Sequence, residues 1–292
     1  MKKLFAFWLS IPLLASLSSC GGGTLEDGVF TIGLEAAYAP FNWTTTDKDL
    51  GVPIANSGFL GLGRTYVAGY DVEIAQYVAE GNEFDLQVRK IAWDGLIPAL
   101  QSGSIDAIVA GMTDTPSRRE SVSFSSPYYE SHLVMVVRAD GDFASASSID
   151  DFSGAYLAAQ IGTVQNDLII DYASDDGEDD LYVEGLIAGT PYETYPDALL
   201  ALLEANSGLD GVLAEEPIGA AMVEQHPSEL ALVEFWADET TYDDNFVISV
   251  SIAVRHEDAD LLIAIDATLA TLDVTTRVQW MQEAISASQA DQ

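Results

Sequence analysis

Two short segments of the sequence carry residues whose chemistry suits a small charged ligand. The first contains Arg118, which follows Thr115 and Pro116, a pair that can cap and begin a helix. A cation in the first turn of a helix opposes the positive end of the helix dipole, and such violations are typical of functional positions. Arg118 can hold a carboxylate through two parallel hydrogen bonds. The alternative is a solvated surface arginine, which is the interpretation we prefer for Arg119.

Further candidates lie directly after predicted strands, where open α/β sheets bind ligands. Gly111 and Thr113 follow the apolar run 105–110, which suits a buried parallel strand. The Thr113 hydroxyl and backbone could serve carboxylate and ammonium groups, and Gly111 would let a ligand approach a bare carbonyl. Gly162 and Thr163 precede a predicted helix, whose first N–H groups form a cradle for a carboxylate. Either pair could instead belong to an ordinary turn or cap.

The charge balance excludes one large class of partner. The 292 residues include 11 Lys and Arg against 47 Asp and Glu, a formal net charge of −36. Phosphate binding needs clustered cations, and the sequence has no basic patch, so nucleic acid is excluded. We interpret the acidity as a heavily solvated surface. Hydrophobic residues make up 48% of the chain, which is enough for a folded core without disulfides.

The N-terminal residues have the layout of an export signal. Lys2 and Lys3 precede the apolar stretch 4–17, which is too short for a membrane span. The sole cysteine, Cys20, follows Leu-Ser-Ser and precedes three glycines. Residues 17–20 resemble a bacterial lipobox, so we predict a signal peptide over 1–19 and a lipidated Cys20 with a linker over 20–27. The alternative is an ordinary signal peptide with a chance cysteine.

Apolar runs alternate with helical patterns along the rest of the chain, which predicts an α/β fold. Strands are expected over 29–34, 84–91, 105–110, 133–137, 155–160, 209–214 and 247–254. Helices are expected over 71–79, 93–101 and 196–204, from 113, from about 165 and from 217, and through most of 258–286. In the helix 196–204 we expect Leu199, Leu200, Leu202 and Leu203 to supply the core face.

Three of these segments resemble one protein family closely. Residues 93–103 (WDGLIPALQSG), 105–108 (IDAI) and 111–113 (GMT) are similar to the periplasmic solute-binding proteins of polar amino-acid ABC importers. The likeness extends over nearly the whole mature chain, and residues 32–43 and 160–165 also carry it.

The resemblance implies a two-lobed periplasmic-binding-protein fold, with two hinge strands and a ligand cleft between the lobes. Lobe 1 would be discontinuous, over 28–130 and 248–292, and lobe 2 would cover 131–247. The implied partners are a free amino acid and a membrane permease, and the protein would be a monomer without cofactors.

The resemblance also assigns roles to residues of the site. The family's arginine at the place of Arg118 grips the ligand carboxylate. Its aspartate at the place of Glu215 pairs with the ligand α-ammonium; here the residue is Glu, one methylene longer, and the adjacent Glu216 is an alternative. Tyr38 and Trp93 match positions whose rings flank the ligand side chain, where aromatic faces can clamp an amide or a guanidinium.

Two further positions bear on ligand class. Glu35 stands where the family often has Asp, near the tip of the ligand side chain, and Gln160 falls where the family often contacts that side chain. A carboxylate favours a cation or an amide donor over an acid. The resemblance therefore implies arginine, lysine, histidine or glutamine as the ligand.

Catalysis has little support in the sequence. His132, His226 and His256 fall in no metal-ligand spacing, so no metal site is predicted, and no nucleophile elbow or phosphate loop is present. We predict a binding protein rather than an enzyme. Two alternatives stay open: a dehydratase of the same fold that acts on cyclohexadienyl acids, using Glu35 or Glu215 as the acid, and a ligand-sensing ectodomain.

Overall fold

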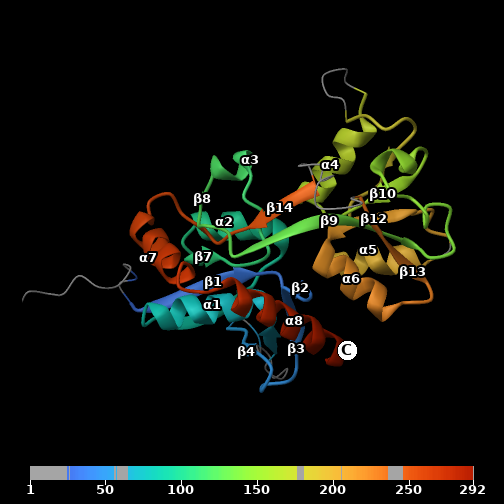
Figure 1. The fold of residues 1–292 in the computed structure, drawn as a ribbon. Coiled ribbons are helices and arrows are strands. Elements are labelled where there is room, and N and C mark those ends of the chain that lie inside the picture. Colours follow the sequence, from blue (N-terminus) through green and yellow to red (C-terminus); the bar gives the residue numbers. More distant parts are fainter. Residues whose placement is uncertain are drawn as a thin grey trace, which may run out of the picture.

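Two mixed sheets with helices packed on them form the two lobes of the molecule (Figure 1). The structure, a computed structural model, describes residues 25, 27–55, 57, 65–175, 181–204, 206–235 and 246–291. The predicted signal peptide 1–19 and Cys20 lie outside the described residues. Among the described helices, none combines the length and the apolar character that crossing a membrane requires.

The sheet of the first lobe has the strand order β6-β1-β7-β15-β8. Its strands are β1 (Val29–Leu34), β6 (Asp85–Lys90), β7 (Ala107–Ile108), β8 (Ser123–Phe124) and β15 (Ala253–Val254). β1 pairs in parallel with β6 and β7, while β15 enters antiparallel from near the C-terminus. The first lobe is therefore discontinuous in sequence, since its sheet includes a strand from beyond the second sheet.

The sheet of the second lobe has the order β11-β10-β12-β9-β13. Its strands are β9 (Tyr129–Arg138), β10 (Tyr156–Ala158), β11 (Ile187–Ala188), β12 (Gly211–Glu215) and β13 (Leu230–Glu234). The apolar run 133–137 is buried throughout, because β9 lies between β12 and β13 and is covered on both faces.

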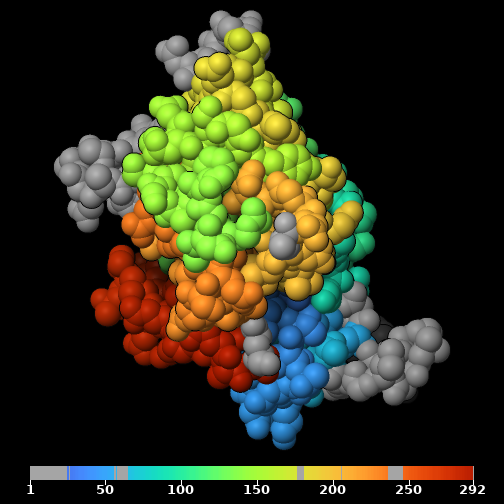
Figure 2. All heavy atoms as spheres, turned by 90° about the vertical axis from the view of Figure 1, so that its right-hand side faces the viewer, coloured from blue at the N-terminus to red at the C-terminus, as the bar shows by residue number. Residues whose placement is uncertain are grey.

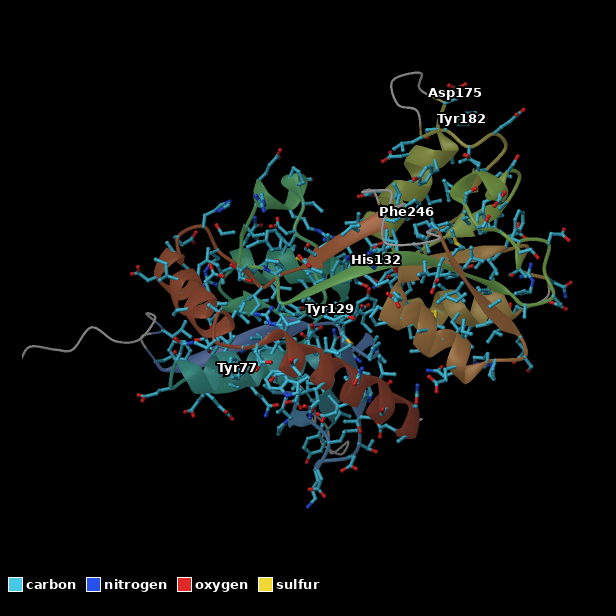
Figure 3. All side chains as sticks on the ribbon, viewed as in Figure 1. Tyr77, Tyr129, His132, Asp175, Tyr182 and Phe246 are labelled. Carbon is cyan, nitrogen blue, oxygen red and sulfur yellow. The ribbon has the colours of Figure 1, made fainter. Side chains whose placement is uncertain are left out.

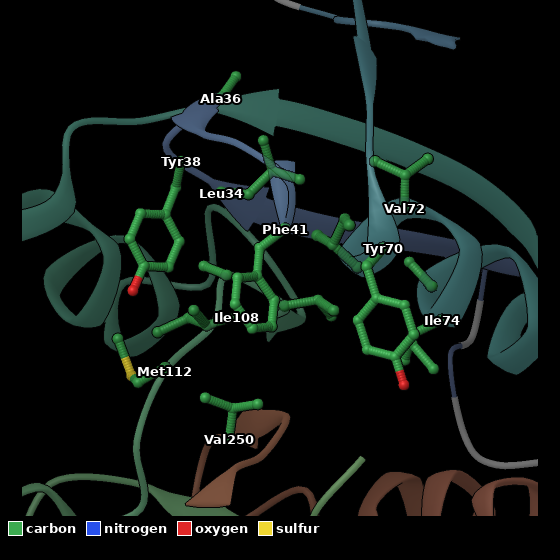
Figure 4. Close-up of a cluster of buried hydrophobic side chains, with 14 of the residues drawn as sticks. Leu34, Ala36, Tyr38, Phe41, Tyr70, Val72, Ile74, Ile108, Met112 and Val250 are labelled. Atoms are coloured by element: carbon green, nitrogen blue, oxygen red, sulfur yellow. The ribbon is translucent and has the colours of Figure 1, made fainter. Parts of the chain in front are cut away.

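A small antiparallel sheet, in the order β2-β3-β5-β4, extends the first lobe beside the cleft. Its strands are β2 (Ala37–Tyr38), β3 (Asn42–Thr45), β4 (Val52–Pro53) and β5 (Tyr66–Ala68). The sheet places Tyr38 next to the core. Figure 4 shows Phe41 among buried side chains that include Leu34, Tyr70 and Ile108.

Helices cover both sheets. They are α1 (Tyr70–Gly81), α2 (Leu96–Gln101), α3 (Pro116–Arg119), α4 (Val164–Ala173), α5 (Tyr195–Leu203), α6 (Glu216–Gln225), α7 (Ala259–Leu269) and α8 (Val274–Ala290), with the 3-10 turns η2 (Trp93–Gly95) and η3 (Ile149–Phe152). α8 packs on α1 in the first lobe and reaches α6 in the second. The space-filling view shows this contact, where orange α6 adjoins the red C-terminal segment (Figure 2).

Two antiparallel segments connect the lobes. β14 (Val247–Val250) pairs with the first half of β9, from Val250 opposite Tyr129 to Val247 opposite His132. Figure 3 places Tyr129 and His132 between the two lobes, and the other half of β9 belongs to the second sheet. These are the two connections expected of hinge strands.

The structure corrects several details of the sequence interpretation. Leu200 is 62% exposed. Leucines at 199, 200, 202 and 203 span a wider arc of the helix than the face that packs on the core, so one of them must point to solvent. The strand expected over 247–254 is two short strands, since β14 pairs with β9 and β15 pairs with β7 and β8. The run 105–110 contributes only the two-residue strand β7, and the helix expected from 113 begins at Pro116, after its cap at Thr115.

Candidate functional site

One cavity between the lobes brings together all nine residues expected at the ligand site. They are Glu35, Tyr38, Trp93, Gly111, Thr113, Arg118, Gln160, Thr163 and Glu215. Most stand just after a strand or at the start of a helix, because parallel strands present their carboxyl ends at one edge of the sheet. The enclosed volume is about 10 Å³, room for about one water. An amino acid can enter only if the lobes move apart.

Arg118 spans the cleft with its guanidinium. Nη1 donates to the Thr113 carbonyl at 2.7 Å, and Nη2 donates to the Gly162 carbonyl of the other lobe at 3.1 Å. The Thr115 hydroxyl accepts from the Arg118 backbone N–H, as expected of a cap. Burial lowers the pKa of Arg118 to about 10, so the side chain stays charged at neutral pH.

The dipole argument for Arg118 is wrong, although the residue does reach the cavity. α3 has four residues, so Arg118 lies in its last turn as much as in its first. A single turn has no separate positive end for the side chain to oppose. The position of Arg118 is set by the cap at Thr115 and by the side-chain bonds across the cleft.

Trp93 supports Arg118 rather than standing alone in the cleft. The Arg118 guanidinium carbon lies 5.4 Å from the centre of the Trp93 ring, a cation–π distance. The Trp93 indole N–H donates to the same Gly162 carbonyl at 3.0 Å. Two first-lobe side chains therefore converge on one backbone carbonyl of the second lobe.

The second lobe contributes a helix N-terminus. Thr163 is the N-cap of α4, and its hydroxyl accepts from the Asn166 N–H at 3.3 Å. The same hydroxyl donates to the Gln160 carbonyl at 2.7 Å. The cap thereby fixes the turn 160–163. Gly162 in this turn has a φ of +69°, a conformation that other residues rarely adopt.

Glu35 and Gln160 meet across the cleft. The Gln160 amide donates to both Glu35 carboxylate oxygens at 2.9 Å and to the Glu193 carbonyl at 2.9 Å. Glu35 is 6% exposed, and burial raises its pKa while the bond from Gln160 opposes that rise. Burying a carboxylate at such a place costs free energy unless a cation or strong hydrogen-bond donors contact it.

Glu215 is the least satisfied group in the cavity. It ends β12, is 2% exposed, and its Oε2 has no hydrogen-bond partner within the part of the chain that is described. Burial raises its pKa to about 8. Its neighbour Glu216 is half exposed, with a carboxylate oxygen 3.9 Å from His132 Nδ1. Of the two glutamates, Glu215 is the one that lines the cavity.

A buried polar network lies behind the first-lobe wall. The Tyr128 hydroxyl accepts from the Gly111 N–H at 3.0 Å and donates to the Asp71 carboxylate at 2.5 Å. Asn42 donates to the other Asp71 oxygen at 2.7 Å. Gly111 has a φ of +64°, and a Cβ there would lie 2.8 Å from the Tyr38 ring. The network and the glycine together hold the loop that carries Thr113.

Sequence reasoning missed three residues that line the cavity, namely Val164, Gln165 and Tyr195. Val164 and Gln165 open α4 directly after the Thr163 cap, so the predicted helix start could have indicated them. Tyr195 is 1% exposed and opens α5 before Pro196. In the described residues, no cluster of three or more His, Cys, Asp or Glu could hold a metal ion.

Comparisons with known proteins agree with this architecture. Residues 56–284 match the family model of bacterial extracellular solute-binding proteins, family 3, over more than half of the chain. ABC transporter arginine-binding protein 1 of Escherichia coli (strain K12) is 24% identical over 272 residues, 93% of each chain.

Two solved structures share the fold. A truncated, arginine-bound form of ArgBP from T. maritima is 28% identical, with a TM-score of 0.65 over 85% of this chain and 98% of that one. An ancestral arginine-binding protein bound to glutamine is 25% identical, with a TM-score of 0.66 over 88% of this chain and 97% of that one. The chain belongs to family 3 of the bacterial extracellular solute-binding proteins.

Proposed function

We propose that this protein captures a cationic amino acid, with L-arginine first, and delivers it to the permease of an ABC importer. The charge set of the enclosed cavity carries the proposal. Its ionisable side chains with a formal charge are Glu35, Glu215 and Arg118, which sum to −1. A zwitterion with a cationic side chain carries +1 and would neutralise them, whereas an acidic amino acid would leave buried charges without partners.

Each charge then has an assigned partner on the ligand. Arg118 would hold the α-carboxylate with the remaining donors of its fork, aided by the N–H groups at the start of α4 after Thr163. Glu215 would meet the α-ammonium, which supplies the partner that its Oε2 lacks among the described residues. The Gly111 carbonyl and the Thr113 hydroxyl would complete the main-chain contacts.

The side-chain end of the ligand would lie near Glu35 and Gln160, beside the Tyr38 ring. A guanidinium can form charge-assisted bonds to Glu35 and present its flat face to an aromatic ring. Glutamine is the second candidate, because its side-chain amide can donate to Glu35. Unlike a guanidinium, however, the amide leaves the charge of Glu35 uncompensated. The arginine-binding name of the E. coli relative and the glutamine-bound ancestral structure support keeping both.

Closure of the lobes is part of the proposed mechanism. We assign 28–130 and 248–292 to the first lobe and 131–247 to the second, with β9 and β14 as hinges. The small enclosed volume and the bonds from Arg118 and Trp93 to Gly162 support a closed arrangement that must open for entry. Binding would shift the equilibrium between open and closed forms, and the closed form would dock on the permease.

We further propose that the protein is exported as a monomeric lipoprotein and is not an enzyme. The family description as extracellular supports export, and the signal layout before Cys20 supports an anchor. One acyl chain anchors a protein only marginally, so Cys20 should carry more than one. Intact-mass analysis of the protein from native membranes would refute the anchor if it found an unmodified Cys20.

A calorimetric ligand panel tests the function. We expect L-arginine to bind most tightly, lysine, histidine and glutamine more weakly, and glutamate and aspartate not at all. Preferential binding of an acidic amino acid would overturn the assignment. Turnover of a cyclohexadienyl acid by the purified protein would instead identify the dehydratase alternative.

A further inference from the structure

A second cavity adjoins the amino-acid pocket between the lobes. Its volume is about 260 Å³, far larger than the space enclosed in the pocket itself. Apolar side chains make up most of its lining, from β2 and the loop after it on one side and from α5 and α6 on the other: Ala37, Ala39, Leu199, Ile218, Ala221 and Met222. The cavity therefore has room and chemistry for an apolar group.

Two aromatic rings separate this side cavity from the pocket. Tyr38 and Tyr195 are the only residues that line both spaces within the described parts of the chain. Their ring centroids lie 5.2 Å apart with planes inclined by 37°, and both side chains are buried. Tyr38 comes from the first lobe and Tyr195 from the second, so the partition is formed by contact across the cleft.

Each ring is held in place from its own lobe. Tyr38 stacks on Phe41 at 5.5 Å and touches the bare Cα side of Gly111. The Tyr195 hydroxyl donates to the Leu213 carbonyl at 3.2 Å, and α5 is capped at Thr194 just before the ring. A buried ring with a bonded hydroxyl at the start of a capped helix has little freedom to swing aside.

Tyr195 also stands at the side-chain end of the proposed ligand. The Gln160 amide, which donates to Glu35, also donates at 2.9 Å to the carbonyl of Glu193, two residues before Tyr195. The start of α5 therefore lies beside the pair of residues assigned to the ligand's distal end. An extension of the ligand beyond Glu35 would meet the partition before it reached the side cavity.

We propose that Tyr195 is a specificity-determining residue, whose ring limits the length of the ligand side chain by closing the pocket against the apolar side cavity. The inference rests on the proposed binding of arginine. Tyr195 need make no polar contact with the ligand; its ring excludes analogues that carry an apolar extension. Replacing it with a small residue would join the two spaces and admit such analogues.

The test measures affinity along a homologous series. Calorimetry would compare L-arginine with its Nω-methyl, Nω-ethyl, Nω-propyl and Nω-butyl derivatives on the native protein, Tyr195→Ala and Tyr195→Phe. The native protein should bind the longer members progressively less well. Tyr195→Ala should reverse that trend, because each methylene that enters an apolar cavity strengthens binding about fourfold. Tyr195→Phe keeps the ring and should discriminate as the native protein does.

A filling substitution serves as the matched control. In the double variant Tyr195→Ala, Ala221→Leu, the side cavity is narrowed again, so the gain for long derivatives should fall while arginine binding persists. Should Tyr195→Ala not fold, Tyr195→Val removes the ring while keeping an apolar side chain, and the same comparison applies.

The outcomes separate this inference from the proposed function. Failure of the native protein to bind L-arginine would refute the proposed function. If arginine binds to the native protein and to a ring-less variant, but that variant rejects the longer derivatives as strongly as the native protein, Tyr195 does not set ligand length. A mere packing role would lower stability without changing the ratio of affinities along the series.

Discussion

Replacing Glu215 with glutamine should let the lobes close without a ligand. In the closed arrangement the Glu215 carboxyl is fully buried and its pKa rises from 4.5 to about 8. With the lobes apart, water would reach the group and its pKa would return toward the ordinary value. Closing the empty cleft at neutral pH therefore requires the carboxylate either to take up a proton or to be buried with its charge.

The size of this effect follows from the shift. One pKa unit corresponds to about 1.4 kcal/mol, so a rise from 4.5 to about 8 opposes empty closure at neutral pH by about 3 kcal/mol. Because the closed-state pKa is the higher one, protonation favours closure. The opposition is absent below about pH 4.5, grows as the pH rises, and is complete above about pH 8. A ligand ammonium beside Glu215 would remove it.

Small-angle X-ray scattering of the ligand-free protein measures the closure. The native protein should be more compact at about pH 5 than at about pH 8. Glu215→Gln should be more compact than the native protein at the higher pH and should respond less to pH. Burial also raises the pKa of Glu35, which titrates in the same direction, so the comparison of variants isolates Glu215. Glu216→Gln, at the exposed neighbour, is the control.

The prediction fails if the native protein and Glu215→Gln show the same radius of gyration at both pH values. The same variant should bind arginine about 10- to 100-fold more weakly, because it loses a charged hydrogen-bonding partner for the ammonium. Weaker ligand binding and easier closure of the ligand-free cleft should occur together. Simple destabilisation of the fold would not produce both effects.

Three other substitutions test the remaining roles. Arg118→Ala should abolish amino-acid binding in calorimetry with the circular dichroism spectrum unchanged, and near-native affinity would remove Arg118 from the site. Glu35→Gln should weaken a cationic ligand much more than glutamine, because only the cation loses a Coulomb term; equal losses would contradict that role. Tyr128→Phe leaves the Gly111 N–H and the Asp71 carboxylate short of a buried partner. It should lower the free energy of unfolding by about 1–3 kcal/mol in denaturant titrations, and unchanged stability would refute the network's importance.

The sequence predicted which residues line the cavity between the lobes better than it predicted how the lobes meet. Strand-end and helix-start positions such as Thr113 and Thr163 can be read from local patterns, because the carboxyl edge of a parallel sheet is a property of the fold. The pairing of Glu35 with Gln160 and the contact of Tyr38 with Tyr195 are not local. Both join residues from different lobes, and their geometry depends on how the lobes meet.

The errors in the strands and helices have related causes. An apolar run such as 247–254 has the same sequence pattern whether it forms one strand of one sheet or passes from one sheet to another. The break between β14 and β15, at Ser251 and Ile252, therefore could not be predicted from the local sequence. Leu200 was expected inside because leucine is usually buried. The exposed side of α5 carries it nonetheless, while Ala198 and Leu202 make the contacts with the core.

The hydrogen-bond network around Asp71 is a feature that no sequence motif predicts. Asp71 lies in the first turn of α1, Asn42 opens β3, and Tyr128 lies just before the hinge strand β9. Asn42 and Tyr128 both donate to Asp71, and the Tyr128 hydroxyl also accepts from the backbone N–H of Gly111. A buried carboxylate is tolerated there because two side-chain donors reach it. Tyr128, which precedes the hinge strand β9, is therefore hydrogen-bonded to Gly111, in the loop proposed to touch the ligand. A displacement of Gly111 by the ligand would act directly on the start of β9.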